Sequence, residues 1–142
     1  MVVAMAREVD VGIDVELTDA PVYRFAHRFL TEQEFWIVAS LPEAKRHSQL
    51  FKLWCTKEAI LEAAGYGLSA DPRSIQVLKS SDAQLACVPS VEWRARVWGV
   101  ADTKFDDMTD VTLAWSLGSG VMEPSVVRPQ TDLKIKAGFA DW

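Results

Sequence analysis

The 142-residue chain lacks the features that mark secreted, membrane-spanning and nucleic-acid-binding proteins. Its two cysteines, Cys55 and Cys87, are too far apart for a metal or redox motif, so we expect buried thiols in a reducing compartment. No apolar run approaches the roughly 20 residues of a membrane span, and no signal-peptide pattern opens the chain. A net charge of -5 disfavours nucleic acid as the main partner. These absences predict a cytoplasmic protein.

The length and composition predict one globular domain. A hydrophobic content of 49% and a charged content of 25% are ordinary for such a domain. From Gly118 onward the pattern dissolves into Gly, Ser, Pro and single charges. We therefore expect a domain over residues 1–117 and a peripheral or flexible tail over residues 118–142.

The order of apolar patterns predicts an α+β fold. Two short strands, 2–6 and 9–17, open the chain, and the break between them is a candidate hairpin turn. Two short helices follow, the second capped by Thr31 and Glu34 as a capping box. A long helix then begins at Pro42-Glu43 and ends at Gly65-Tyr66-Gly67. We expect it to pack against an antiparallel sheet that includes the strand-like runs 74–78, 85–88, 93–100 and 111–117.

The long helix carries a carboxylate on its apolar stripe. Leu50, Phe51, Trp54, Glu58 and Leu61 recur at steps of three and four, so they share one face. A buried carboxylate is costly unless a cation, a metal or several donors satisfy it. Glu58 therefore predicts either an ion pair or a functional site.

Two further carboxylates lie on one strand. Asp14 and Glu16 are two residues apart, so they point to the same face. With Glu58 they give three hard oxygen ligands, which suit Mg²⁺ or Mn²⁺. Two simpler interpretations remain open: the strand pair faces water at a sheet edge, or Glu58 pairs with Arg24 or Arg28.

Three motifs carry a resemblance to a known family. GIDVE, then RFLTEQE, then LWCTKEA followed by GYGL resemble the 4′-phosphopantetheinyl transferases in order and spacing, over roughly residues 2–78. Val3 to Glu16 and Leu53 to Leu68 are most similar to the C-terminal half of the two-lobed surfactin-type enzymes. The single-domain holo-acyl-carrier-protein synthases share the same two motifs.

The resemblance implies a reaction and a set of roles. It implies transfer of 4′-phosphopantetheine from coenzyme A to a serine of an acyl or peptidyl carrier protein, as in fatty acid or polyketide biosynthesis. Asp14, Glu16 and Glu58 would hold Mg²⁺, and either Glu58 or a metal-bound water could take the serine proton. Further implied roles are a phosphate contact for Lys57, a place beside coenzyme A for the 62 position and for Gly65 and Gly67, and carrier-protein docking for Arg24, Phe25 and Arg28.

Several of these residues also have simpler interpretations. Lys57 would equally suit an exposed helix lysine, and the arginine-bearing helix face could simply be solvated. Gly65 and Gly67 fit a helix end and turn at least as well as a phosphate cradle.

The chain departs from the family pattern in two ways. Glu62 stands where the family usually has a lysine that contacts phosphate or the serine. The two-lobed enzymes also have an N-terminal lobe with a Ser-His motif, for which the sequence has no counterpart. We therefore expect a homo-oligomer or a neighbouring domain to complete the site. The alternative is a catalytically impaired relative that binds a carrier protein or a partner.

Overall fold

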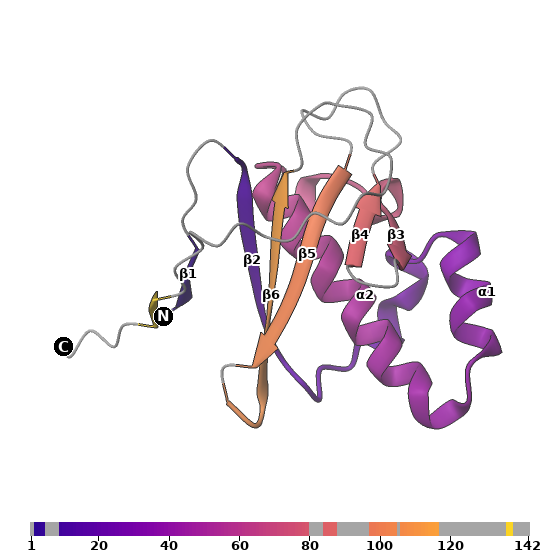
Figure 1. Ribbon diagram of the computed structural model, residues 1–142. Helices are drawn as coiled ribbons and strands as arrows, with labels where there is room; N and C mark the ends of the chain where they lie inside the picture. Colours follow the sequence, from indigo (N-terminus) through magenta and orange to yellow (C-terminus); the bar gives the residue numbers. More distant parts are fainter. Residues whose placement is uncertain are drawn as a thin grey trace.

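A five-stranded antiparallel sheet forms one layer of the protein (Figure 1). The computed structural model describes residues 2–4, 9–79, 84–87, 97–104, 106–116 and 136–137. The strand order is β2-β6-β5-β4-β3, so β2 and β3 are the edge strands. The bounds are Val11–Leu17 for β2, Gln76–Lys79 for β3, Gln84–Cys87 for β4, Val97–Lys104 for β5 and Thr109–Ser116 for β6.

The long helix α2 (Glu43–Ala63) covers one face of the sheet and packs mainly on β2 and β6 (Figure 1). The core of this layer consists of apolar side chains from the helix and from the facing strands: Ala59, Ile60, Leu61, Ile75, Trp98, Val100 and Ala114. Burial of this apolar surface is the main force that fixes α2 on the sheet. The predicted α+β fold, with an antiparallel sheet against a long helix, is confirmed.

A second core lies between α2 and the two shorter helices. These are the 3₁₀ segment η1 (Val22–Arg28) and α1 (Glu32–Ser40). Phe29 and Trp54 pack with ring centroids 5.3 Å apart, and Phe25 lies 4.9 Å from Trp54. This aromatic cluster anchors η1 against the middle of α2.

Both predicted helix-end motifs are confirmed. The Thr31 hydroxyl accepts a hydrogen bond from the backbone N–H of Glu34, whose carboxylate accepts one from the N–H of Thr31, as a capping box requires. At the end of α2, the N–H groups of Gly65 and Tyr66 donate to the carbonyls of Glu62 and Leu61. This is the Schellman pattern, and it requires the left-handed conformation that Gly65 adopts at φ 76°.

The N-terminal hairpin prediction is wrong. The first strand, β1 (Val2–Val3), pairs with β7 (Lys136–Ala137) in a separate two-stranded sheet, whereas β2 pairs with β6. A two-residue strand can pair with any free edge, so sequence proximity did not determine its partner. Apart from β7, the predicted tail over residues 118–142 lies outside the described residues, as do residues 93–96 of the third predicted run.

Candidate functional site

The candidate site lies where β2 and α2 touch. A Cβ atom added to Gly12 would overlap the Ala59 carbonyl oxygen and the Ala63 nitrogen, and would lie 2.9 Å from the Ala63 Cα. The absence of a side chain at residue 12 therefore lets the helix backbone rest directly on the strand. This close approach sets the height of α2 above the neighbouring residues of β2.

Asp14 and Glu16 follow Gly12 at steps of two, so they point towards the same helix-covered side of the sheet. Both residues are half-buried, whereas Val15 and Leu17 on the opposite face are 44% and 53% exposed. An amphipathic strand normally buries its apolar face. Here β2 turns its carboxylates inwards, as the sequence pattern predicted for a shared face.

Glu58 faces the same strand from α2. Cys55, Glu58, Ala59 and Glu62 lie at helical spacings of three and four, so they share the face of α2 that meets β2. Glu58 is only 8% exposed, and its Oε1 atom has no hydrogen-bond partner among the described residues. The predicted burial of Glu58 is confirmed, and the ion pairs found within the described residues do not include it.

The carboxylates of this site repel one another. Burial raises the pKa of Glu58 to about 7, and the negative charges of Asp14, Glu62 and Glu16 add to the rise. Burial also raises the pKa of Asp14 to about 6, opposed by a hydrogen bond to the Cys55 side chain and reinforced by Glu16. The Oδ2 atom of Asp14 is buried without a partner among the described residues. A bound cation would reduce the repulsion between the carboxylates and would coordinate the buried oxygens that have no hydrogen-bond partner among the described residues.

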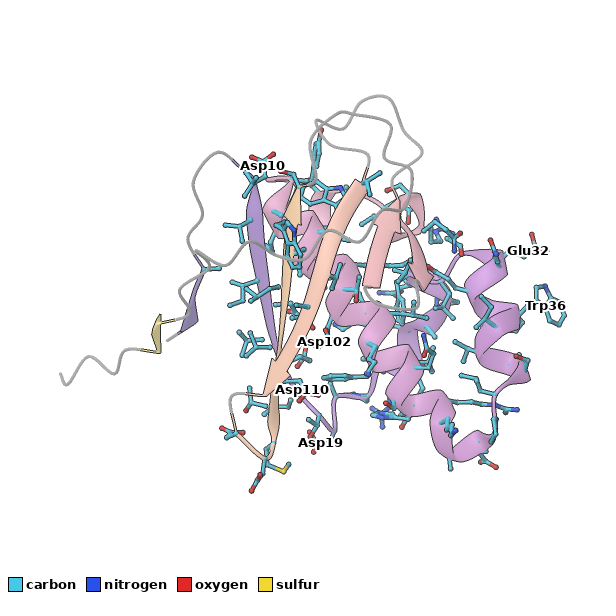
Figure 2. The ribbon with its side chains drawn as sticks, in the orientation of Figure 1. Asp10, Asp19, Glu32, Trp36, Asp102 and Asp110 are labelled. Carbon is cyan, nitrogen blue, oxygen red and sulfur yellow. The ribbon has the colours of Figure 1, made fainter. Side chains whose placement is uncertain are left out.

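The sheet register adds polar residues that sequence reasoning missed. Asp110 on β6 stands opposite Glu16, and Thr112 stands opposite Asp14. The Thr112 hydroxyl donates to Asp102 Oδ1 of β5 at 2.9 Å. Figure 2 shows Asp102 and Asp110 on neighbouring strands in the same half of the sheet. The alternation of Asp110, Thr112 and Ala114 was visible in the sequence, but only the strand register aligns it with β2.

Lys57 occupies an unexpected place. Its side chain is fully buried, so the interpretation of an exposed helix lysine is wrong. The ammonium donates to the Phe29 carbonyl at 2.6 Å and to Glu34 Oε2 at 2.7 Å. Burial lowers the pKa of Lys57, and the adjacent Glu34 carboxylate opposes that effect. The predicted phosphate contact stays untested, but the ammonium already has two partners inside the protein.

Glu62, Gly65 and Gly67 lie at the C-terminal end of α2. Glu62 is exposed one turn after Glu58, and its Oε1 atom lies 3.5 Å from where a Cβ atom of Gly67 would stand. Gly67 has φ 49°, so its backbone, like that of Gly65, adopts a conformation that favours glycine. The capping role of Gly65 is confirmed, whereas a phosphate-binding role for Gly65, Gly67 or the 62 position stays a prediction.

The residues predicted to dock a carrier protein divide into two kinds. Arg24 and Arg28 are exposed on η1, and Arg24 lies over the Tyr23 ring at 5.8 Å. Phe25 is half-buried in the aromatic cluster with Phe29 and Trp54. Only the two arginines therefore offer freely accessible side chains to a partner.

The residues present fit a hard divalent cation in chemistry, because they supply carboxylate oxygens from two facing elements. In this conformation no three His, Cys, Asp or Glu side chains of the described residues are arranged to hold a metal ion. A site with Asp14, Glu16 and Glu58 therefore requires side-chain rotation towards a shared centre.

The described helices include none long and apolar enough to cross a membrane.

Fold and site together define an α+β domain with a buried acidic centre between a strand and a long helix. In a sequence comparison, the profile of the 4′-phosphopantetheinyl transferase superfamily matches residues 10–115. The chain belongs to this superfamily.

Individual relatives match over shorter stretches. The chain is 31% identical over 83 residues to the 4′-phosphopantetheinyl transferase psf-1 of Bacillus pumilus, covering 58% of this chain and 36% of that protein. It is 43% identical over 63 residues to a holo-[acyl-carrier-protein] synthase of Streptococcus pyogenes serotype M12, covering 40% of this chain and 53% of that protein. The matched stretches thus span between about a third and about half of these two relatives.

Solved structures support the same fold. The holo-[acyl-carrier-protein] synthase of Thermotoga maritima superposes with a TM-score of 0.63 at 24% identity, over 83% of this chain and 65% of that chain. The holo-ACP-synthase of Plasmodium yoelii superposes with a TM-score of 0.64 at 14% identity, over 80% of this chain and 100% of that chain. At these identities the likeness establishes the fold alone.

Proposed function

We propose that the protein transfers 4′-phosphopantetheine from coenzyme A to a serine of an acyl or peptidyl carrier protein. The observation that carries the proposal is the set of inward-facing carboxylates, with buried unpartnered oxygens on Asp14 and Glu58. Acidic groups held together at a cost in free energy are typical of functional sites. Membership of the superfamily supplies the reaction class.

Asp14, Glu16 and Glu58 are the proposed ligands of Mg²⁺, with Mn²⁺ as a substitute. When bound, the metal neutralises charge on the pyrophosphate of coenzyme A. The Glu58 carboxylate is the proposed acceptor of the proton of the carrier serine. The serine oxygen then forms the new bond to phosphorus, and adenosine 3′,5′-bisphosphate leaves as the old P–O bond breaks. Positioning and charge neutralisation supply most of the rate in such a displacement.

The substrate-facing surroundings are assigned by the same proposal. Gly65, Gly67 and the Glu62 position would line the entrance for the coenzyme A phosphates; their positive φ angles and the closeness of Glu62 Oε1 to Gly67 are compatible with this role. Arg24 and Arg28 on η1 are exposed cations suited to an acidic carrier protein. Phe25 would support them from the aromatic cluster rather than contact the partner. The buried Lys57 ammonium gives no support to a phosphate contact in this conformation.

We also propose that a second chain or a neighbouring domain completes the site. Val15, Leu17 and Met108 expose 44%, 53% and 54% of their surfaces, and the N–H of Thr18 donates to the Met108 carbonyl at 2.9 Å. Exposed apolar side chains therefore lie on the edge strand β2 and in the turn that precedes β6. Val15 and Leu17 lie on the face of the sheet opposite the carboxylates, but β2 is an edge strand of that sheet, so a partner that covers them could also reach round the strand towards the acidic centre.

The competing function is that of an impaired relative which binds a carrier protein or partner without transfer. Glu62 favours it, because a fourth carboxylate raises the charge that the pyrophosphate must meet. Calorimetry distinguishes the two: an active enzyme binds Mg²⁺ and, only with Mg²⁺ present, coenzyme A. Asp14→Asn should abolish both heats, with Asp19→Asn in the loop after β2 as the control. Wild type that binds neither ligand contradicts the enzyme proposal.

A further inference from the structure

The buried Glu34–Lys57 ion pair neighbours the candidate site, because Lys57 directly precedes Glu58 on α2. Glu34 is 1% exposed and Lys57 is fully buried, yet both side chains carry charged groups. Burying such a pair removes both ions from water at a high cost in desolvation free energy, and replacing it with apolar residues is often neutral or stabilising. Stability alone is therefore a poor reason for its presence.

The pair joins four segments at one point. Lys57 belongs to α2, and its ammonium holds the Phe29 carbonyl at the end of η1 at 2.6 Å. The partner carboxylate of Glu34 caps α1 by accepting from the Thr31 N–H at 2.9 Å, and its second oxygen accepts from the Val77 N–H of β3 at 3.0 Å. Each charge is thus satisfied through backbone groups as well as by its partner.

The position of Lys57 in α2 links this ion pair to the orientation of Glu58. Lys57 and Glu58 are adjacent, so their side chains leave the helix about 100° apart. Lys57 points towards η1, α1 and β3, while Glu58 points towards Asp14 on β2. Holding the ammonium of Lys57 fixes the rotation of α2 about its axis, which in turn fixes the direction of the Glu58 carboxylate.

We propose that Glu34 and Lys57 are positioning residues, which orient the Glu58 carboxylate towards the metal site. Through the Phe29 carbonyl they also couple that orientation to the position of η1, the segment that carries Arg24 and Arg28. The inference rests on the proposed function, because it assigns Glu58 a cation to bind. It assigns Lys57 to the interior instead of the substrate phosphates. Glu34 thereby gains a role beyond the capping of α1.

The test compares Mn²⁺ affinity among folded variants by calorimetry, well below their unfolding temperatures. We expect Glu34→Gln and Lys57→Met each to weaken Mn²⁺ binding about tenfold or more, as loss of residues that orient metal ligands typically does. Val38→Ala removes buried volume from the second core on α1 without touching the pair, so it should lower stability but leave Mn²⁺ affinity unchanged. Equal affinities in all variants overturn the inference.

Two further measurements keep the outcome decisive. The double variant Glu34→Gln/Lys57→Met leaves no unpaired charge, so it should regain stability without regaining Mn²⁺ affinity. Recovery of both would reduce the pair to packing and overturn the inference. If wild type binds no Mn²⁺, the proposed function fails, and hydrogen exchange decides the positioning role separately. Faster exchange at residues 29–30 and 57–61 in Lys57→Met than in Val38→Ala supports it, and equal exchange overturns it.

Discussion

At the scale of single residues, the site is dominated by carboxylates whose charges the fold does not compensate. Asp14 and Glu58 have raised pKa values because they are desolvated and close to like charges. A fold that tolerates this arrangement must recover the free energy elsewhere, in the two apolar cores that hold α2. Such uncompensated acidity is typical of functional sites.

This acidity predicts how stability depends on pH. The native state holds protons on Glu58 up to about pH 7 and on Asp14 up to about pH 6, whereas the unfolded chain releases them near 4.5 and 3.8. Between these limits the native state binds more protons, so the free energy of unfolding should fall as pH rises, by at most about 6 kcal/mol for the two full shifts and by less where solvent screens the half-buried Asp14. Urea unfolding in EDTA from pH 4 to pH 8 measures this slope.

The matched control for the pH prediction is the variant Asp14→Asn/Glu58→Gln. It should lose the slope, because its native state no longer takes up the extra protons. Added Mg²⁺ should raise the stability of wild type most at high pH, where the carboxylates are ionised. A wild-type slope that survives in the double variant would assign the effect to other groups.

The exposed residue Glu62 gives a second prediction. Glu62→Lys should raise the rate of phosphopantetheine transfer about tenfold, since it replaces a repelling charge by a cation where charge develops. Initial rates at saturating coenzyme A measure the change, with Glu62→Gln as the intermediate case. An unchanged rate would mean that another cation, from a second chain or domain, already acts there.

At the scale of secondary-structure elements, the contact between β2 and α2 decides the geometry of the site. Gly12→Ala should destabilise the protein by about 3 kcal/mol, because the new Cβ meets helix backbone that cannot rotate away. Gly65→Ala is the control: it has open space but a positive φ, so it should cost about 1 kcal/mol. Denaturant unfolding measures both. Equal costs would contradict the close-contact explanation.

The elements also show what the sequence could reveal. The capping box at Thr31 and the glycine at the end of α2 were predictable, because their signals are local and chemically specific. The shared face of Asp14 and Glu16 followed from strand periodicity alone. The partner of β1, the alignment of Asp110 with Glu16, and the ion pair of Lys57 depend on contacts between distant segments. Local patterns do not determine such contacts.

Lys57 illustrates this limit in one residue. It lies at steps of three and four from Trp54 and Leu61, so the apolar periodicity already placed it beside the core. Lysine is rarely fully buried unless it is paired. Its partner Glu34 had a sufficient local explanation as part of a capping box, so the sequence offered no reason to join the two.

At the scale of the whole molecule, the exposed apolar residues Val15 and Leu17 on the edge strand β2, with Met108 in the turn before β6, predict assembly. We expect light scattering to give a particle mass of at least two chains, and Leu17→Asp to shift it towards one chain. Trp36→Asp on α1 is the control, because Trp36 is 63% exposed on a helix at the far side of α2 from β2 (Figure 2). A monomeric wild type would favour a neighbouring domain as the missing cover.

The central claim concerns transfer to a carrier protein, and mass spectrometry tests it most directly. The protein is incubated with coenzyme A, Mg²⁺ and several apo-carrier proteins, with Glu58→Gln and an EDTA sample as controls. We expect at least one carrier protein to gain the mass of a single phosphopantetheine on its serine, and neither control to give it. No adduct on any carrier protein, from wild type that binds Mg²⁺ and coenzyme A, would contradict the claim.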